Sequence, residues 1–250
     1  MNKNLVNQDY WDNNYQDLTF FKVPDESVIK QWVNKYIPDS DGDCIEIGTF
    51  PGGYLEMFGQ KGYRLNGIDL TPRVKEEEAG WLKSLGHKVG EFEQIDFLKF
   101  KPNRKYQVVC SFGFIEHFSD YLGILKKQAD MVTTGGYLVV EVPNFRGFVQ
   151  RFLHSFLDRE NYERHNIKSM KTSEWVELLE ASGFEIVTQG PLGGFDFWHD
   201  KQERTARQEK YLGKVMKKLP KWKVRYRRPT NLYSPYLGVI ARRKTPFIDK

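Results

Sequence analysis

Two acidic residues follow two apolar runs of the sequence, and a glycine-rich loop lies between them. Glu46 stands near the end of the run CIEI, the loop GTFPGG follows, and Asp69 ends a second apolar run 23 residues later. Glycines after a first strand let a ligand approach the backbone, and an acid ending the second strand accepts hydrogen bonds from ribose hydroxyls. A carboxylate at Glu46 would repel a pyrophosphate. The pattern therefore favours a nucleoside that carries a positive charge and no phosphate.

This chemistry requires strands and helices that bring the acids to one edge of a sheet. The apolar patterns predict strands at 43–48, 64–70, 87–97, 106–112, 137–142, 184–189 and 235–242, and helices at 24–37, 53–60, 74–85, 119–132, 148–157, 172–182 and 203–219. Strands that alternate with helices predict a parallel sheet covered on both faces. Glu46 and Asp69 fall at carboxyl ends of its strands, where such sheets bind ligands. Asp96 and Ser111 fall there too.

Local signals predict where several helices begin and end. Acids at Asp25 and Glu26 suit the first turn of the helix at 24–37, because the helix dipole is positive there. Gly135 and Gly136 are expected to stop the helix at 119–132. Thr172 or Ser173 is expected to cap the helix at 172–182.

The composition is that of a globular protein. The chain has 250 residues, of which 40% are hydrophobic and 15% aromatic, enough for one large domain with a substantial core. It lacks an N-terminal apolar run typical of a signal peptide and any run of about 18 apolar residues. The two cysteines, Cys44 and Cys110, lie inside strand-like runs, which indicates buried thiols in a reducing compartment and no zinc site. We expect a soluble, cytoplasmic protein.

With these motifs the chain resembles the class I S-adenosylmethionine-dependent methyltransferases of the small-molecule type. EIGTFPGG resembles their acid-x-Gly loop, GIDL the strand with the ribose-binding acid, and QIDF the segment with the adenine-contacting acid. VVCSFGFIEHF resembles their fourth-strand motif, and TTGGYLVVEVPN the glycine turn and fifth strand. The loop departs from the usual pattern, because Phe50 stands where a middle glycine is common and Pro51 follows it.

The resemblance implies an α/β fold with a seven-stranded, doubly wound, Rossmann-like sheet. This sheet is mostly parallel with an antiparallel last strand, has helices on both faces, and carries a helical and basic lid insertion. Residues 1–250 would form a single methyltransferase domain, with an N-terminal helical cap at 1–40 and acceptor-side insertions at 146–170 and 191–233. The implied cofactor is S-adenosylmethionine, and the residues expected to bind it are Tyr15, Glu46, Gly48, Gly52, Asp69, Leu70, Asp96, Phe97, Ser111 and Phe112.

The N-terminal segment DYWDNNYQ resembles the aromatic segment that folds over the cofactor in small-molecule members of the family. Tyr10, Trp11 and Tyr15 would then close the pocket. The alternative is that these aromatic side chains attach the N-terminal segment to the core without contacting the cofactor.

The segment after the fourth strand restricts the methyl acceptor. It reads SFGF where methyltransferases of exocyclic base amines usually carry an Asn/Asp-Pro-Pro-aromatic run, so base amines are disfavoured. Cys110 lies within the strand and is therefore a poor nucleophile for pyrimidine carbon. No acid cluster suggests a magnesium site, and no metal is expected. An oxygen remains the favoured acceptor atom, ahead of an aliphatic nitrogen or carbon.

Transfer to an alcohol benefits from a general base, and histidine is the usual candidate. His117 lies just after the fourth strand and is the first choice, followed by His165 in the insertion. His87 begins a strand at the wrong sheet edge, and His154 is expected on a helix face. His199 could reach over the site as a lid residue. The alternative for each histidine is a purely structural role.

Positive charge is concentrated in one segment. The chain has a net charge of +5, and 201–228 contains twelve Lys and Arg against two acids, so the remainder carries −5. Within it, 203–219 has an apolar helical stripe, and KWKVRYRR at 221–228 alternates as a half-exposed strand would. Two interpretations remain open: a helix that covers the sheet with a solvated basic face, or a dock for an anion. Candidate anions are a nucleotide-sugar diphosphate, a lipid headgroup at a membrane surface, and nucleic acid.

The sequence thus predicts methyl transfer to a small or carrier-linked acceptor, phosphate-bearing in one version, with a sugar or secondary metabolite favoured. The alternative is an RNA-binding protein or RNA methyltransferase that uses 201–228, although nucleic acid is the less favoured partner.

Overall fold

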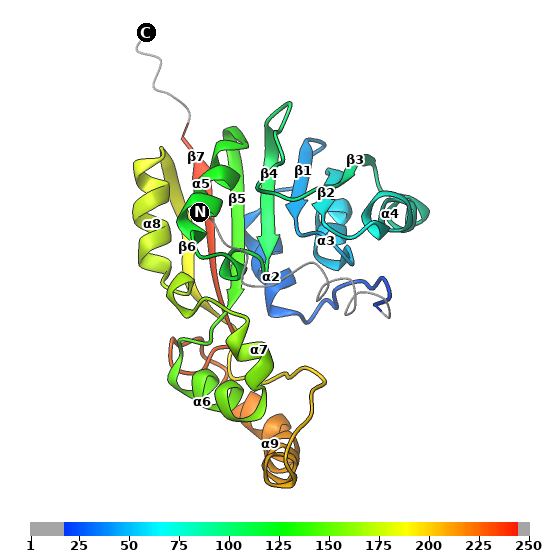
Figure 1. The fold of residues 1–250 in the computed structure, drawn as a ribbon. Coiled ribbons are helices and arrows are strands. Elements are labelled where there is room, and N and C mark those ends of the chain that lie inside the picture. Colours follow the sequence, from blue (N-terminus) through cyan, green and yellow to red (C-terminus); the bar gives the residue numbers. More distant parts are fainter. Residues whose placement is uncertain (1–17, 245–250) are drawn as a thin grey trace.

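The computed structural model describes residues 18–244, which form a mixed sheet with helices on both faces (Figure 1). Its strands are β1 Asp43–Ile47, β2 Arg64–Asp69, β3 Val89–Gln94, β4 Tyr106–Phe112, β5 Val132–Pro143, β6 Phe184–Leu192 and β7 Tyr236–Arg243. The order of these seven described strands is β3-β2-β1-β4-β5-β7-β6. Strands β1 to β5 run parallel, whereas β7 is antiparallel to both β5 and β6. The predicted sheet, with its antiparallel last strand, is confirmed.

Helices separate most of the strands, as predicted, whereas β3 and β4 are joined without one. The helices are α2 Val28–Tyr36, α3 Gly53–Gln60, the π-helix η1 Val74–Glu78, α4 Ala79–Ser84, the 3₁₀-helix η2 Ile115–His117, α5 Tyr121–Asp130, α6 Phe148–Leu157, α7 Arg159–Glu163, the 3₁₀-helix η3 Ile167–Ser169, α8 Thr172–Ala181 and α9 Ala206–Arg225. None of these described helices has the length and apolar character needed to cross a membrane.

Alternate residues of the central strands face two separate cores. Ile45 of β1 packs into the core beneath α5 and α8, whereas the neighbouring Cys44 packs into the core beneath α2, α3 and α4. This two-residue period is that of a strand buried on both faces. Cys44 and Cys110 are free, buried thiols with their sulfur atoms 3.9 Å apart, as the sequence predicted.

Three predicted helix boundaries were wrong. Gly135 and Gly136 lie inside β5, which begins at Val132, and α5 has already ended at Asp130. A Cβ atom on Gly136 would lie 2.7 Å from the carbonyl oxygen of Gln107 in β4, so close strand approach explains this glycine. The acids Asp25 and Glu26 precede α2 and do not lie in its first turn, and α8 has Lys171 at its N-cap position.

Helices α6, α7 and α9 form a separate layer beyond the carboxyl ends of β4 and β5 (Figure 1). Helix α9 packs on α6 through a small core that includes Leu153, Leu212 and Leu219, and it does not cover the sheet as one interpretation expected. The predicted strand at 221–228 was wrong, because α9 continues to Arg225. Trp222 extends the apolar stripe of the helix and packs edge-on against Phe195, with ring centroids 5.7 Å apart.

Candidate active site

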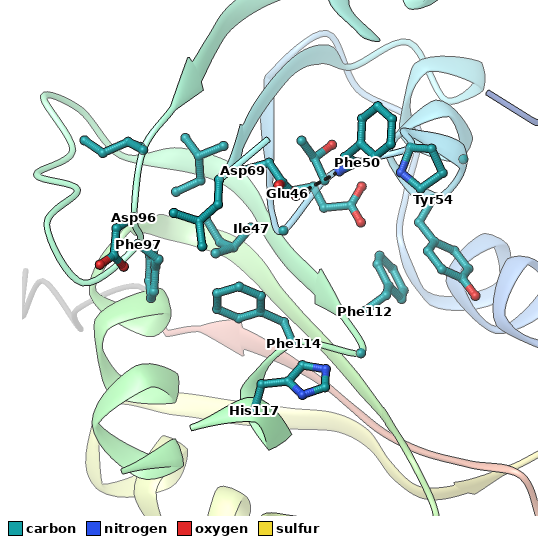
Figure 2. A pocket seen from close by; sticks show the side chains of 18 of the residues that line it. Glu46, Ile47, Phe50, Tyr54, Asp69, Asp96, Phe97, Phe112, Phe114 and His117 are labelled. Atoms are coloured by element: carbon teal, nitrogen blue, oxygen red, sulfur yellow. Dashed lines mark hydrogen bonds between the residues drawn. The ribbon is translucent and has the colours of Figure 1, made fainter. Parts of the chain in front are cut away.

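A cavity of about 170 Å³ opens at the carboxyl ends of β1, β2 and β4 (Figure 2). The chain leaves β1 toward β2 on one side and later returns to β4 on the other, so this is the point where strand order reverses. Its lining residues are Phe21, Glu46, Ile47, Gly48, Thr49, Phe50, Pro51, Gly53, Tyr54, Ile68, Asp69, Leu70, Ile95, Asp96, Phe97, Phe112, Gly113, Phe114, His117 and Phe118.

Glu46 places a buried carboxylate in the wall of this cavity. The residue is 1% exposed, and its Oε2 atom has no hydrogen-bond partner within the described part of the chain. Burial raises the pKa of Glu46 well above its usual value, and the nearby Cys110, Glu78 and Asp69 raise it further. A cationic ligand would supply the positive charge that stabilises the ionised form of this carboxyl group.

The loop from Gly48 to Gly52 is held by contacts on both sides. Gly48 has a φ of +74°, and a Cβ atom there would lie 2.7 Å from the ring of Phe114. The Thr49 hydroxyl donates a 2.6 Å hydrogen bond to Glu78 of η1, a carboxyl that is fully buried. The Phe114 ring next to Gly48 and the hydrogen bond from Thr49 to Glu78 hold the loop beside the cavity, where its backbone can face a ligand.

Asp69, the last residue of β2, joins this loop to the next turn. Its Oδ2 accepts a 3.2 Å hydrogen bond from the Phe50 backbone N–H, and its Oδ1 accepts a 2.9 Å bond from Thr71 N–H. The Phe50 ring lies edge-on to Phe20, and the Arg73 guanidinium lies 4.7 Å from the Phe50 ring centroid. Phe50 thus takes part in the loop's attachment at a position where related loops commonly have glycine.

The expected adenine side of the site is apolar with one carboxylate. Asp96 lies two residues beyond β3, and its Oδ1 accepts a 2.9 Å hydrogen bond from Leu98 N–H. Phe97 is buried and meets Phe114 edge-on, with ring centroids 5.8 Å apart. Leu70 completes this end of the lining. A flat apolar ring would fit between such side chains.

The remaining expected cofactor residues have different placements. Phe112 lines the cavity and stacks on Tyr54 with ring centroids 4.5 Å apart. Ser111 lies outside the lining, and its hydroxyl donates to Gln128 of α5 at 3.1 Å. Gly52 has a φ of +81° at the start of α3 and also lies behind the lining. Tyr10, Trp11 and Tyr15 lie outside the described residues.

His117 of η2 lines the cavity opposite Glu46 and Asp69 (Figure 2). Its Nδ1 lies 3.3 Å from the Arg164 carbonyl oxygen, and its ring lies 4.8 Å from that of His165. His165 is not among the residues that line the cavity. Burial lowers the pKa of His117 to about 4 and lowers the pKa of His165 well below its usual value. Both imidazoles are therefore neutral at neutral pH.

The other three histidines lie away from the cavity. His87 contacts Glu56 at 3.0 Å, and the fully buried His154 contacts Asp158 at 2.9 Å. His199 lies near Arg204 at the start of the segment that leads into α9. Each of these histidines has a polar side-chain contact within the protein.

Sequence reasoning missed three residues of the site. Glu78 clamps the glycine loop, and Tyr54 forms part of the cavity wall. Glu116, next to His117, is fully buried, and burial raises its pKa to about 8. Glu78 lies within the run KEEE, where the sequence shows no sign that one acid of three points inward.

Comparison with known proteins is consistent with this geometry. A family model described as a methyltransferase domain matches residues 24–189. No curated protein matches the sequence significantly.

Several solved structures share the fold. A putative methyltransferase from Bacillus halodurans C-125 is 18% identical, with a TM-score of 0.59 over 86% of this chain and 98% of that chain. N-methyltransferase NodS from Bradyrhizobium japonicum WM9, in complex with S-adenosyl-L-homocysteine, is 14% identical, with a TM-score of 0.54 over 97% and 95% of the two chains. Magnesium protoporphyrin IX methyltransferase from Synechocystis PCC 6803, with bound S-adenosylmethionine, is 12% identical, with a TM-score of 0.55 over 95% and 93%.

Proposed function

The chain belongs to the methyltransferase-domain family and is an S-adenosylmethionine-dependent methyltransferase, and on this premise we propose that it methylates an oxygen of a small or carrier-linked acceptor. A sugar or secondary metabolite is the favoured class, with nitrogen or carbon as less favoured acceptor atoms. The observation that carries the proposal is the cavity with Glu46 and Asp69 on one side and His117 on the other. The solved neighbours include an N-methyltransferase, so the choice of oxygen rests on the residues of this chain.

The cavity residues fit the cofactor. S-adenosylmethionine supplies a methyl group on a positively charged sulfonium. Glu46, whose buried Oε2 has no hydrogen-bond partner in the described residues, would face the cationic methionine part. Asp69 would accept hydrogen bonds from the ribose hydroxyls, and Asp96 with Phe97 would hold the adenine. The backbone around Gly48 would approach the ligand closely, and Leu70 and Phe112 would complete its apolar contacts.

His117 is the side chain best placed beside the acceptor. Its Nδ1 faces a carbonyl oxygen, which can only accept, so Nδ1 carries the proton and Nε2 carries the lone pair. In this proposal Nε2 receives the proton of the acceptor hydroxyl, and His165 supports the ring from behind. Holding the acceptor oxygen in line with the methyl group would supply much of the rate.

The layer of α6, α7 and α9 fits an acceptor side with an anionic group. Among the described residues, α9 exposes Lys214, Lys217 and Lys218 on one stretch. Phe148 and Phe152 of the adjoining α6 are 73% and 63% exposed. Exposed aromatic side chains beside lysines suit a phosphate-bearing carrier, including a lipid at a membrane surface. The segments 146–170 and 191–233 would then form the acceptor-side insertions of a single domain.

The direct test is methyl transfer from labelled S-adenosylmethionine to a panel of free sugars, nucleotide-sugars, lipid-linked sugars and RNA. We expect transfer to a hydroxyl-bearing small or carrier-linked compound, with turnover at least about 100-fold lower in His117→Ala. His199→Ala, away from the cavity, serves as the matched control. Transfer only to RNA, with binding that weakens steeply between low and moderate salt, would contradict the proposal and support the RNA alternative.

The basic layer has its own test. In Lys214→Glu/Lys217→Glu/Lys218→Glu, KM for a phosphate-bearing acceptor should rise while kcat and cofactor affinity stay unchanged. Lys83→Glu/Lys99→Glu/Lys101→Glu, with the same change in charge on another part of the surface, should behave like the unmodified protein. Equal effects of the two triple variants on KM would show that the layer provides no specific dock.

A further inference from the structure

Three potential metal ligands meet beside the cavity, and one of them, His117, lines it. Glu116 and His117 are adjacent in η2, and His165 follows α7, a segment about fifty residues later in the chain. One ligand atom from each lies within 4.8 Å of the others, and Glu116 Oε1 is 4.0 Å from His165 Nε2. Two short segments that are distant in sequence therefore bring together two imidazoles and one carboxylate.

The two imidazole rings use the same nitrogen, Nδ1, to contact a backbone carbonyl oxygen. His117 Nδ1 lies 3.3 Å from the carbonyl oxygen of Arg164, and His165 Nδ1 lies 2.6 Å from that of Asn161. A carbonyl oxygen can only accept, so each Nδ1 carries its ring's proton and each Nε2 carries the lone pair. A backbone carbonyl that fixes the outer nitrogen is the usual support of a metal-binding histidine.

The side chain of Glu116 is buried without a hydrogen bond from any described residue. It is fully buried, and neither carboxylate oxygen has a hydrogen-bond partner among residues 18–244. Glu141 of β5, a second buried carboxyl that interacts electrostatically with Glu116, also has an unsatisfied oxygen in the described structure. A buried carboxylate is normally paired with a cation or coordinated to a metal. A purely structural role for the two histidines would not explain why the carboxyl group of Glu116 is buried next to them.

We propose that Glu116, His117 and His165 bind one divalent transition-metal ion at the acceptor end of the cavity. Two imidazole nitrogens and one carboxylate oxygen suit Zn²⁺, Mn²⁺, Fe²⁺ or Co²⁺, whereas Mg²⁺ and Ca²⁺ prefer oxygen ligands throughout. Bonds of about 2.0–2.2 Å place neighbouring ligand atoms about 3 Å apart, so binding would draw the three groups together by about 1 to 2 Å.

The site changes the role of His117 within the proposed function, and only this consequence rests on that function. With the ion bound, His117 Nε2 is a ligand and does not receive the acceptor's proton. Of the three ligands only His117 lines the cavity, so an acceptor oxygen bound in the cavity would approach the ion from the His117 side. A hydroxyl bound to the ion would lose its proton more readily than a free one, and because the metal-bound His117 cannot take that proton, the proton would pass to a solvent water.

Metal titration of the untagged full chain, freed of metal with a chelator, tests the proposal. With Co²⁺ as the probe, we expect one ion per chain and visible absorption bands with nitrogen and oxygen ligation, unaffected by millimolar Mg²⁺. Glu116→Gln and His165→Gln should each weaken Co²⁺ binding at least about 10- to 100-fold. His199→Gln, which removes an imidazole elsewhere, should leave binding unchanged. No Co²⁺ binding, or binding that Glu116→Gln and His165→Gln leave intact, would overturn the site.

Calorimetry with S-adenosylmethionine on the same samples separates this site from the proposed function. Glu116→Gln that binds the cofactor normally but has lost Co²⁺ shows a folded protein and supports the metal site. Co²⁺ binding in a chain that does not bind the cofactor would contradict the methyltransferase account and leave the metal site standing. Cofactor binding without Co²⁺ binding would overturn the metal site alone.

Discussion

Gly48 shows how one residue without a side chain makes room for the ligand. Its positive φ of +74° turns the chain sharply after β1, and the space of a Cβ atom is filled by the Phe114 ring. The same turn places the Thr49 hydroxyl on Glu78 and the Phe50 N–H on Asp69. The loop geometry therefore depends on a residue that makes no side-chain contact itself.

Gly48→Ala should destabilise the protein by about 2 to 4 kcal/mol, because strain at positive φ adds to a clash with Phe114. Gly86→Ala provides the control, since Gly86 has a φ of +85° but no atom within 4 Å of a Cβ position. Gly86→Ala should lower the free energy of unfolding by about 1 kcal/mol. Urea unfolding measures both variants. Equal losses of stability would show that the Phe114 contact is unimportant and that only backbone strain acts.

At the scale of elements, η1 supports the site from behind. Glu78 is fully buried and accepts the 2.6 Å hydrogen bond from Thr49, so a helix after β2 holds the loop after β1. The 3₁₀-helix η2 carries His117 to the wall of the cavity opposite Glu46 and Asp69. The cavity is thus formed by connections that the sheet brings together, as expected for a doubly wound fold.

Thr49→Val keeps the volume of the side chain but removes its hydroxyl. Because Glu78 then loses its buried donor, we expect destabilisation of about 1 to 3 kcal/mol and weaker cofactor binding through a looser loop. Thr134→Val in β5 makes the same change at an exposed position and should alter stability by less than about 0.5 kcal/mol. If calorimetry shows full cofactor affinity in Thr49→Val, the clamp does not position the loop for binding.

For the whole molecule, sequence patterns predicted the sheet well and its outer layer poorly. Alternation of apolar strands with helices predicted a mostly parallel sheet covered on both faces, because helical connections join neighbouring parallel strands. The strand prediction for 221–228 was wrong because alternation of basic with apolar residues fits a strand as well as the end of an amphipathic helix. Packing of Trp222 against Phe195 and the small core that α9 shares with α6, which only the fold provides, favours the helix.

In the candidate site, too, local sequence patterns predicted some residues, whereas the placement of others depends on the fold. Glu46 and Asp69 could be predicted because strand ends converge on one edge, and both line the cavity. Ser111 faces Gln128 instead, because residues of a strand alternate between faces and a one-residue difference reverses the direction. The meeting of Glu116 with His165 depends on how the connection after α7 packs, and no local pattern specifies it.

The contribution of Glu46 and Glu78 to the stability of the cofactor-free protein should fall as pH rises above about 4.5, the pKa of an exposed glutamate. Burial raises the pKa values of Glu46 and Glu78, so the native state binds more protons than the unfolded state above this pH. Each group then removes up to about 1.4 kcal/mol per pH unit until the pH reaches its folded pKa. Urea unfolding between about pH 5 and pH 8 should show a shallower fall in Glu46→Gln. Parallel curves for the two proteins would contradict the assignment.

The central claim is that carboxylates at the ends of β1 and β2 bind S-adenosylmethionine, and calorimetric titration tests it most directly. The unmodified protein should bind one equivalent, Glu46→Gln should bind about 10- to 100-fold more weakly, and Asp69→Asn should lose affinity as well. Asp41→Asn, an exposed acid near the start of β1, should match the unmodified protein. Equal affinity in the Glu46, Asp69 and Asp41 variants, or no binding by the unmodified chain, would contradict the account.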